Sequence, residues 1–427
     1  MLKILGVIVV FLLMLTAGCS KTSQPNIILI IVDTLRADHL GCYGYHRDTS
    51  PTIDSLAVTG TMWEDVQAQS SWTLPAITSI FTGLDVRQHG AGRKNDIVYG
   101  MNPNTPFLPL LLNQSGYATF GIFNVYLLSE QFGFNKGFDN FSCNWMGSTE
   151  AENSVNQAID LIQNHNHNDP FFLALHVFDV HDPYDPPPPF DLLFSLNGSE
   201  GITDWPRLES GALDNPEYYK EHLINMYDGE IASTDFQISR LFQYLRNSGL
   251  DENTVIIVTS DHGEEFLEHN GFGHGKTMYQ EVVHVPLIIS GPGFESNLVN
   301  STICAHIDIL PTILDLVGVE NPPNLRGFSL LDNSIPQRAI PSSNVNSAYA
   351  PIVAAIRFGD SKLIWNSLSD ESHEFNLSTD PLELNPVTFQ ESLLDSVLFY
   401  WSTPPVLPPT TSNREIIDAA LRDLGYF

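Results

Sequence analysis

Basic side chains are scarce in this chain of 427 residues. Lysine and arginine together number 19 against 50 aspartates and glutamates, which gives a formal net charge of −31. Such a surface repels the phosphates of nucleic acids, and no basic patch in the sequence offsets the repulsion. The composition therefore excludes nucleic acid as a partner. It also requires that an anionic substrate be held by a metal ion or by local dipoles, because the overall field opposes its approach.

Cysteine is equally scarce, with four residues in the chain. None has the CxxC or Cys/His spacing of a thiolate zinc site. If Cys19 carries lipid, the remaining Cys42, Cys143 and Cys304 allow at most one internal disulfide. The protein is therefore not a disulfide scaffold, and a zinc site built from thiolates is not expected.

The apolar run at the start of the chain, MLKILGVIVVFLLMLTAGC, is too short to span a membrane as a helix. A spanning helix needs about 20 apolar residues, so the run predicts a cleaved export signal. Its end, Leu-Thr-Ala-Gly-Cys, resembles a bacterial lipobox. We expect residues 1–18 to be a lipoprotein signal peptide and the exported protein to be tethered to a membrane through lipidated Cys19. A secreted protein and an uncleaved anchor are the alternatives.

Short, nearly continuous apolar runs recur along the rest of the chain, without the alternation of a half-exposed strand. Such runs are typical of strands buried on both faces of a parallel sheet. A helical pattern over 231–245 lies between two of them, and alternating strands and helices predict an α/β layered domain. The runs are 27–32, 171–177, 255–258 and 285–289.

Polar side chains follow three of these runs. Asp33 follows the first run, and Asp179 and His181 come shortly after the second. Asp261 and His262 follow the third after two intervening residues. A single aspartate after a strand is usually a turn former. Ligands in open α/β sheets, however, bind at the carboxyl ends of the strands, so three such ends together predict a functional site.

The segment SSWTLPAITSIFTG raises the question of what Thr73 does. Thr73 precedes Leu-Pro75 and an apolar helix that Gly83 ends, so it fits a helix N-cap above a buried helix. The same position suits a nucleophile, because the first N–H groups and the helix dipole stabilise a bound anion. The local pattern alone favours the cap.

Two carboxylates and an imidazole at the strand ends shift this balance. Asp33, Asp261 and His262 form a mixed oxygen and nitrogen set that suits Mn²⁺, Zn²⁺ or Mg²⁺. A divalent ion bound also to the Thr73 hydroxyl lowers the pKa of that hydroxyl and polarises a phosphoryl or sulfuryl oxygen. His181 and a cation within Gly273-His-Gly-Lys276 then serve to protonate the leaving group or to hold the other oxygens.

With these residues in place, the chain resembles the sulfatase family of the alkaline phosphatase superfamily. The resemblance covers most of the mature protein. It rests on the following segments in this order: PNIILIIVDTLRADHLGCYGY, SSWTLPAITSIFTGL with VRQHG, PFFLALHVFDVHDPYDPP, NTVIIVTSDHGEE, GHGKTMYQEVVHVPLII, HIDILPTILDLVG and HEFNLSTDPLELN.

The resemblance implies a three-layer α/β fold with a mainly parallel central sheet, plus a small C-terminal α+β subdomain. We place the catalytic domain at 24–335 and the subdomain at 336–427, ending in a short helix after a proline-rich connection. The resemblance implies one divalent metal ion (Mn, Zn, Mg or Ca), with a second ion through Asp179, His181 or His274 left open.

Carried over by position, the resemblance makes Asp33 and Asp261 metal ligands and His181 the catalytic histidine. His262 stands where many family members have asparagine. Lys276 falls on the catalytic lysine of the family, although His274 fits a comparable place.

Several residues depart from the family pattern. The Cys-x-Pro-x-Arg that yields the formylglycine nucleophile reads Thr73-Leu-Pro75-Ala-Ile77 here, so both the cysteine and the arginine are absent. The usual second aspartate is Thr34, and Asn124 lies near the place of a missing Lys-x-His. We take Thr34 and Asn124 as candidate substrate-binding residues.

The missing formylglycine bears on the reaction. A formylglycine hydrate expels sulfate by eliminating back to the aldehyde, whereas a sulfated threonine has no such exit. A phosphothreonine is readily hydrolysed or passed to another acceptor. The sequence therefore predicts a hydrolase of anionic esters that acts through covalent Thr73, with phosphate or phosphonate esters favoured. The alternatives are a true sulfatase without formylglycine, a phosphotransferase, and an inactive lipid-tethered binding protein.

Overall fold

The computed structural model describes residues 24–94, 97–145, 150–194, 217–332, 335–344 and 352–387. The predicted signal peptide, Cys19 and the predicted final helix lie outside these residues, so they stay predictions. None of the helices in the described part of the chain combines the length and apolar character that crossing a bilayer requires.

An eight-stranded, mainly parallel sheet forms the centre of the molecule, as predicted. β1 lies inside it, and its parallel neighbours are β8 on one side and β9 on the other. In spatial order the strands are β13 (Leu298–Asn300), β2 (Thr61–Trp63), β12 (Leu287–Ser290), β9 (Thr254–Ser260), β1 (Asn26–Val32), β8 (Phe171–Val177), β6 (Ala118–Phe123) and β7 (Asn140–Cys143).

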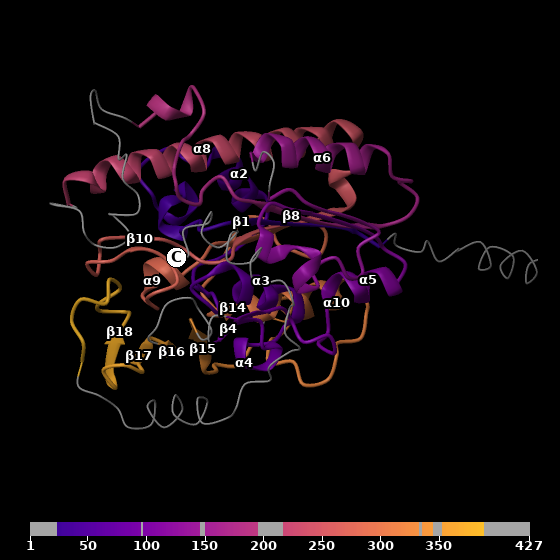
Figure 1. Cartoon of the computed structure of the whole chain (residues 1–427). Helices are drawn as coiled ribbons and strands as arrows, with labels where there is room; N and C mark the ends of the chain where they lie inside the picture. Colours follow the sequence, from indigo (N-terminus) through magenta and orange to yellow (C-terminus); the bar gives the residue numbers. More distant parts are fainter. Residues whose placement is uncertain are drawn as a thin grey trace, which may run out of the picture.

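The apolar run of β1 is continuous because both of its faces are covered. Alternate side chains of a strand point to opposite faces, and those of β1 enter two separate hydrophobic clusters. One cluster contains Leu29 together with the helices α3, α5 and α10; the other contains Ile30 together with α2, α6 and α8 (Figure 1). These helices are α2 (Pro51–Thr59), α3 (Thr73–Thr82), α5 (Leu108–Gln114), α6 (Ala151–Gln163), α8 (Glu217–Ser248) and α10 (Ile309–Val317).

One strand differs from the prediction of parallel strands. The run 285–289 contributes to β12, which pairs antiparallel with β9. After β9 the chain does not cross back behind the sheet. It stays at the edge where β9 ends and forms β10 (Glu265–Phe266), β11 (Phe272–Gly273) and the short helix α9 (Gln280–Val283). β12 therefore starts at that edge and has to run in the opposite direction.

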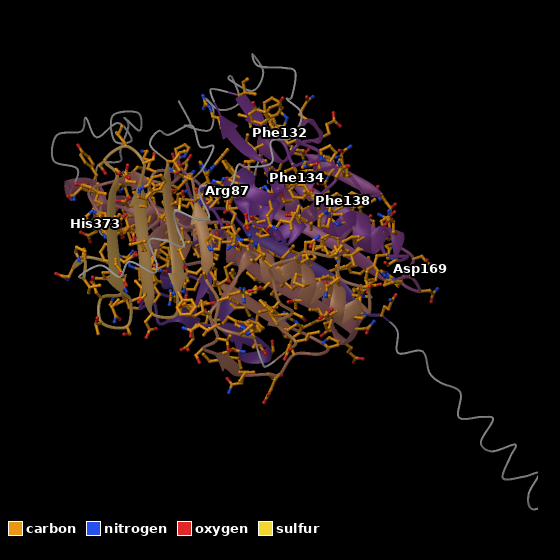
Figure 2. All side chains as sticks on the ribbon, turned by 90° about the horizontal axis from the view of Figure 1, so that it is seen from below. Arg87, Phe132, Phe134, Phe138, Asp169 and His373 are labelled. Atoms are coloured by element: carbon orange, nitrogen blue, oxygen red, sulfur yellow. The ribbon has the colours of Figure 1, made fainter. Side chains whose placement is uncertain are left out.

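A second sheet of four antiparallel strands forms the small C-terminal subdomain. It consists of β15 (Ile340–Ser343), β16 (Val353–Phe358), β17 (Ser361–Asn366) and β18 (Glu371–Asn376). Figure 2 shows this sheet, marked by His373, on the side of the molecule away from Phe138. The described residues of the subdomain contain strands and turns, and the helix expected there lies beyond them.

A buried ion pair within the subdomain is tied to the main domain through its glutamate. Lys362 Nζ lies 2.8 Å from Glu383 Oε1, and the two side chains are almost fully buried. The other oxygen, Oε2, accepts a hydrogen bond of 2.6 Å from the backbone of Gln280 at the start of α9. Burial lowers the pKa of Lys362 and raises that of Glu383, so each group depends on its partner to stay charged.

We expect Lys362→Ala to lower the free energy of unfolding by roughly 3 kcal/mol, because it leaves Glu383 buried without its cation. Urea unfolding followed by fluorescence measures the change, with exposed Lys136→Ala as the matched control. The double variant Lys362→Met with Glu383→Leu removes both charges and is expected to recover most of the loss. A loss no larger than that of the Lys136 variant would show that the pair contributes little.

Candidate active site

The three central parallel strands deliver their following residues to one edge of the sheet. Val32 of β1 pairs with Val177 of β8 and Ser260 of β9, so the strands end level with one another. Asp33 and the pair Asp261 and His262 begin at that level. One ligand atom from each lies within 4.8 Å of the others, and all three side chains are fully buried. The sequence prediction that strand ends gather here is thus realised in the structure.

The arrangement of these three side chains fits a divalent cation. His262 Nδ1 faces the carbonyl of Gly263 at 3.0 Å, so Nε2 is the ring nitrogen turned toward the carboxylates. That nitrogen lies 3.2 Å from Asp261 Oδ2 and 3.8 Å from Asp33 Oδ1. Asp33 Oδ1 and Oδ2 and Asp261 Oδ2 are buried and receive no well-aligned hydrogen bond from the described residues. Lone pairs that face one another in a buried site call for a positive charge between them.

The two carboxylates differ in acidity because their neighbours differ. Burial by itself raises the pKa of Asp33, but the imidazoles of His176, His181 and His262 outweigh it and lower the pKa to about 2. Burial and the negative charge of Asp33 raise the pKa of Asp261 to about 6. Asp33 is therefore charged across the ordinary pH range, whereas a cation beside Asp261 would offset the burial and repulsion that raise its pKa.

Thr73 is the first residue of α3, and its side chain is 1% exposed. The N-cap position belongs to Trp72, and no side chain caps the helix, so the interpretation of Thr73 as the cap is wrong. Instead the hydroxyl Oγ1 lies 3.4 Å from His262 Nε2. Thr73 thus stands beside the two aspartates and the histidine, at the positive end of the α3 dipole.

His181 and His274 flank the same group. Their ring centroids are 4.8 Å apart, and that of His274 is 4.5 Å from His262. Burial opposes the charge on His181, but the carboxylates of Asp182, Asp33 and Glu264 raise its pKa to about 9. Burial and the rings of His262 and His181 lower the pKa of His274. At neutral pH one ring is therefore a proton donor and the other is neutral.

Lys276 lies in the bend after β11, two residues beyond His274, and its role as the catalytic lysine stays a prediction. Its side chain is half-buried, and Nζ donates to the carbonyl of Phe272 at 3.2 Å. His274 Nδ1 contacts Glu264 Oε1 at 3.0 Å, which holds the ring between His181 and His262. Of the two positions proposed from the sequence, the structure places His274 against the other site residues.

The two candidate substrate-binding residues use their side chains within the protein. Thr34 donates its hydroxyl to the carbonyl of Val180 at 2.8 Å, while its backbone N–H donates to Asp261 Oδ1 at 3.2 Å. Asn124 Nδ2 donates to Ser154 Oγ at 2.9 Å. Thr34 therefore positions Asp261 through its backbone, and the amide of Asn124 contacts α6.

Two residues of the site were missed in the sequence. His176 lies inside β8, fully buried, with Nε2 3.2 Å from Asp33 Oδ2. Glu264 is fully buried and accepts a hydrogen bond of 2.9 Å from Tyr184 while it contacts His274. Burial raises the pKa of Glu264 to about 7. The one signal for His176 was a histidine in the otherwise apolar run FFLALHV, and for Glu264 its place directly after Asp261-His262-Gly.

Comparison with known proteins agrees with this architecture. The profile of the Sulfatase family matches residues 25–319, and that of the C-terminal region of N-sulphoglucosamine sulphohydrolase matches 268–397. An arylsulfatase of Clostridium perfringens is 26% identical over 88% of this chain and 92% of its own length.

Two solved structures with similar folds bind or act on different esters. A structure solved in complex with its substrate D-glucosamine-2-N,6-O-disulfate has a TM-score of 0.73 at 20% identity, covering 94% of this chain and 98% of its own. The phosphonate monoester hydrolase of Agrobacterium radiobacter has a TM-score of 0.69 at 19% identity, covering 94% and 96%. The family profile spans well over half of the sequence. The chain therefore belongs to the sulfatase family of the alkaline phosphatase superfamily and is an ester hydrolase of that family.

Proposed function

We propose that this protein is a metal-dependent hydrolase of anionic esters that uses Thr73 as a covalent nucleophile. The observation that carries the proposal is the contact of 3.4 Å between the Thr73 hydroxyl and His262 Nε2, beside Asp33 and Asp261. Thr73 is 1% exposed, and packing of the helix does not require its hydroxyl to lie beside two carboxylates and an imidazole. The same place suits a group that must be activated before it attacks.

Asp33, Asp261 and His262 would hold one divalent ion, which, when bound, supplies a Lewis acid that acidifies a hydroxyl and neutralises an anionic ester. Thr73 loses its hydroxyl proton to solvent and attacks the phosphorus or sulfur atom, and the bond to the leaving alcohol breaks. The start of α3 directs the positive end of its dipole at the oxygens that gain charge. Water later releases the group from Thr73 and restores its hydroxyl.

The leaving alcohol needs a proton, and His181 is in place to give it. The raised pKa of His181 keeps the ring charged at neutral pH, and its Nε2–H donates to no acceptor among the described residues. Nδ1 is held by the carbonyl of Asp182 at 2.6 Å, so Nε2 is the nitrogen that faces a substrate. His274, which is neutral and held by Glu264, packs against the ring of His262.

Threonine as nucleophile favours phosphorus over sulfur. A phosphothreonine is released by water at phosphorus, whereas a sulfated threonine lacks the elimination that formylglycine allows. Phosphate and phosphonate esters are therefore our first candidate substrates. Sulfate esters are the second candidate, because the arylsulfatase relative spans most of the chain. We further propose that the enzyme is exported and tethered through Cys19, where it meets anionic glycan, lipid or small-molecule esters.

Turnover of a matched panel tests the proposal. We expect the pure protein to hydrolyse three phosphorus esters faster than 4-nitrophenyl sulfate when Mn²⁺, Zn²⁺, Mg²⁺ or Ca²⁺ is added. These esters are 4-nitrophenyl phosphate, 4-nitrophenyl phenylphosphonate and the diester bis(4-nitrophenyl) phosphate. Mass spectrometry of the quenched protein is expected to show the added group on the peptide that contains Thr73. Faster sulfate turnover would select the second candidate, and silence on every ester with every metal would contradict the proposed reaction.

A further inference from the structure

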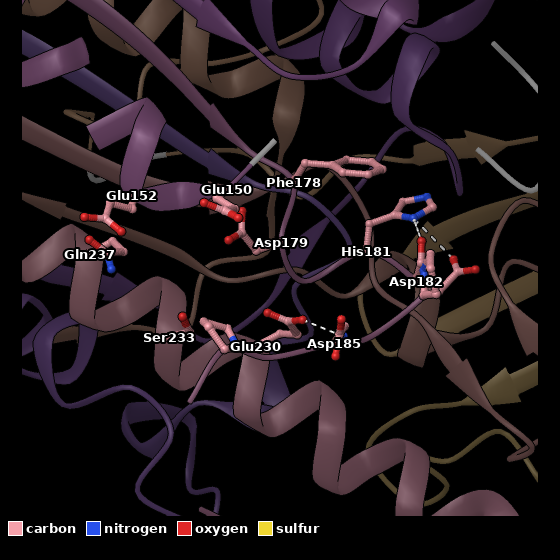
Figure 3. Close-up of a pocket in the computed structure, with 12 residues that line it drawn as sticks. Glu150, Glu152, Phe178, Asp179, His181, Asp182, Asp185, Glu230, Ser233 and Gln237 are labelled. Atoms are coloured by element: carbon pink, nitrogen blue, oxygen red, sulfur yellow. Dashed lines mark hydrogen bonds and ion pairs between the residues drawn. The ribbon is translucent and has the colours of Figure 1, made fainter. Parts of the chain in front are cut away.

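A cavity of about 380 Å³ opens beside His181. It lies between the loop that follows β8 and the helix α8. Figure 3 shows His181 and Asp182 at one end of it and Glu152 and Gln237 at the other. Its lining carries six carboxylates: Glu150, Glu152, Asp179, Asp182, Asp185 and Glu230. Because the cavity shares His181 with the active site, it is where the leaving alcohol of an ester at Thr73 would extend.

Two of these carboxylates have an oxygen without a hydrogen-bond donor among the described residues. Asp179 Oδ1 accepts from the backbone of Ala151 at 2.8 Å, but its Oδ2 is buried and has no partner. Glu230 is 5% exposed, and its Oε1 accepts from the backbone of Asp185 at 2.8 Å. No donor of the described chain reaches Glu230 Oε2. A buried acceptor such as Asp179 Oδ2 is normally satisfied. Glu230 Oε2 is not one of the buried unpartnered atoms, but Glu230 lines the same wall, so the cavity can receive N–H or O–H donors.

The charge of the lining selects between these donors. Burial, followed by the charges of Asp179 and Asp185, raises the pKa of Glu230 to about 8. Burial and the nearby Glu150 raise that of Asp179 to about 6. A neutral hydroxyl leaves this repulsion in place, whereas a cation relieves it. Asp179 and Glu230 belong to none of the metal-compatible sets in the described part of the chain, although one set, His181, Asp182 and His274, shares His181 and Asp182 with the cavity wall.

One further contact favours an organic cation. The half-buried ring of Phe178 stacks on His181 with centroids 4.4 Å apart, and it forms part of the cavity wall. An aromatic ring beside carboxylates provides an apolar surface for carbon atoms and an attractive face for a cation. An ammonium group on a short carbon skeleton uses both features.

We propose that this cavity binds a protonated primary amine on the leaving alcohol, so that the preferred substrates are esters of amino alcohols. Asp179 and Glu230 accept the N–H groups, and Phe178 covers the carbon atoms. The inference rests on the proposed function, because it needs an ester placed at Thr73. The amine belongs either to an amino sugar or to a small amino alcohol, and the chemistry recognised is the same.

Paired esters that differ in the charge of the amine test this inference on the metal-loaded enzyme. One pair is glucosamine 6-phosphate and N-acetylglucosamine 6-phosphate; the other is 2-aminoethyl phosphate and its N-acetyl derivative, and both pairs are repeated as sulfates. We expect kcat/KM to be at least about tenfold higher for the amine in one pair, as for a desolvated charge pair. The pair that shows the larger ratio identifies the source of the amine.

Glu230→Gln keeps the shape and the bond to Asp185 but removes the charge. It is expected to reduce the amine preference to about twofold or less, and its loss of kcat/KM should be larger for the amine esters than for the 4-nitrophenyl esters, whose leaving group carries no amine. Glu221→Gln, an exposed change on the same helix, is the matched control and leaves the preference intact. Equal kcat/KM within both pairs, with normal 4-nitrophenyl turnover, would overturn the inference alone.

Failure of the proposed function gives a different result, namely no turnover of any ester. In that case calorimetry with glucosamine and ethanolamine as free amines decides the question. Binding by the native chain that Glu230→Gln abolishes supports the amine site, and no binding of either amine overturns it.

Discussion

Replacing Thr73 with alanine is expected to lower kcat/KM by about 10⁴-fold or more for every ester that the protein hydrolyses. Loss of a nucleophile that works together with neighbouring groups removes nearly all of the catalysis they provide. Thr73→Ser keeps a hydroxyl at the same place, 3.4 Å from His262 Nε2 in the native chain, and is expected to retain measurable turnover. Steady-state kinetics on the 4-nitrophenyl esters measures both.

Thr78→Ala is the matched control for this change. Thr78 is buried in the same helix, and its hydroxyl donates to the carbonyl of Leu74 rather than to the site. A loss of activity shared by Thr73→Ala and Thr78→Ala would point to damage to α3 and not to a lost nucleophile. Native turnover in folded Thr73→Ala, with no group trapped on the protein, would refute covalent catalysis by Thr73.

Removal of the metal is expected to have the second largest effect. Asp261→Asn removes one of the three proposed metal ligands and should lower activity by more than about 100-fold. Loss of a residue that only hydrogen-bonds to a metal ligand already costs about 10- to 100-fold. A chelator should abolish the activity of the native protein, and one of the four cations should restore it. Elemental analysis after mild purification gives the bound metal directly.

The sign of the accompanying stability change is informative. With no ion bound, Asp261 is forced next to Asp33, and burial and that charge raise its pKa. Asp261→Asn is therefore expected to stabilise the metal-free protein, while the native protein alone gains stability when metal is added, by about 2.7 kcal/mol at 100 times the Kd. Thermal unfolding with and without the cation measures both effects.

Of the two other metal-compatible groups among the described residues, one includes His181, Asp182 and His274 beside the site, and the more distant one provides the control. Glu265, His269 and Glu281 also approach one another closely enough to hold an ion. In the structure His269 Nδ1 instead contacts Glu281 Oε1 at 2.7 Å, and Nε2 faces the carbonyl of Glu383 at 3.2 Å. Both ring nitrogens thus face acceptors, which suits a charged imidazole better than a ligand. If His269→Gln lost the metal and Asp261→Asn kept it, the ion would belong to this group.

The fold was predictable because its central strands consist almost entirely of apolar residues. The run 171–177 matches β8 residue for residue, and β1 and β9 exceed their predicted runs by one to three residues. Continuous apolar residues reflect burial on both faces, which the two hydrophobic clusters provide. The direction of β12 was not predictable, because an apolar strand carries no mark of its polarity, and the short elements before it determine where it starts.

The site was predictable to the extent that its residues follow strands. Asp33, Asp261 and His262 could be expected together because parallel strands end at one edge. His176 was missed because its place within β8 hides it among core residues, and contact with Asp33 depends on the pairing of β8 with β1. The contacts of His274 with His181 and His262 likewise depend on the fold of β11 and the turn after it, which short polar segments do not reveal.

The level ends of β1, β8 and β9 have a consequence for how this gene can change through evolution. Insertion or deletion of one codon inside any of the three strands moves each later side chain to the opposite face and shifts the strand's end by about 3.3 Å. Such a change would turn His176 away from Asp33 or separate Asp33 from His262. Changes of length should therefore accumulate in the loops, while these three strands keep their lengths. New substrates can then evolve along the cavity without any alteration of the residues that perform the reaction.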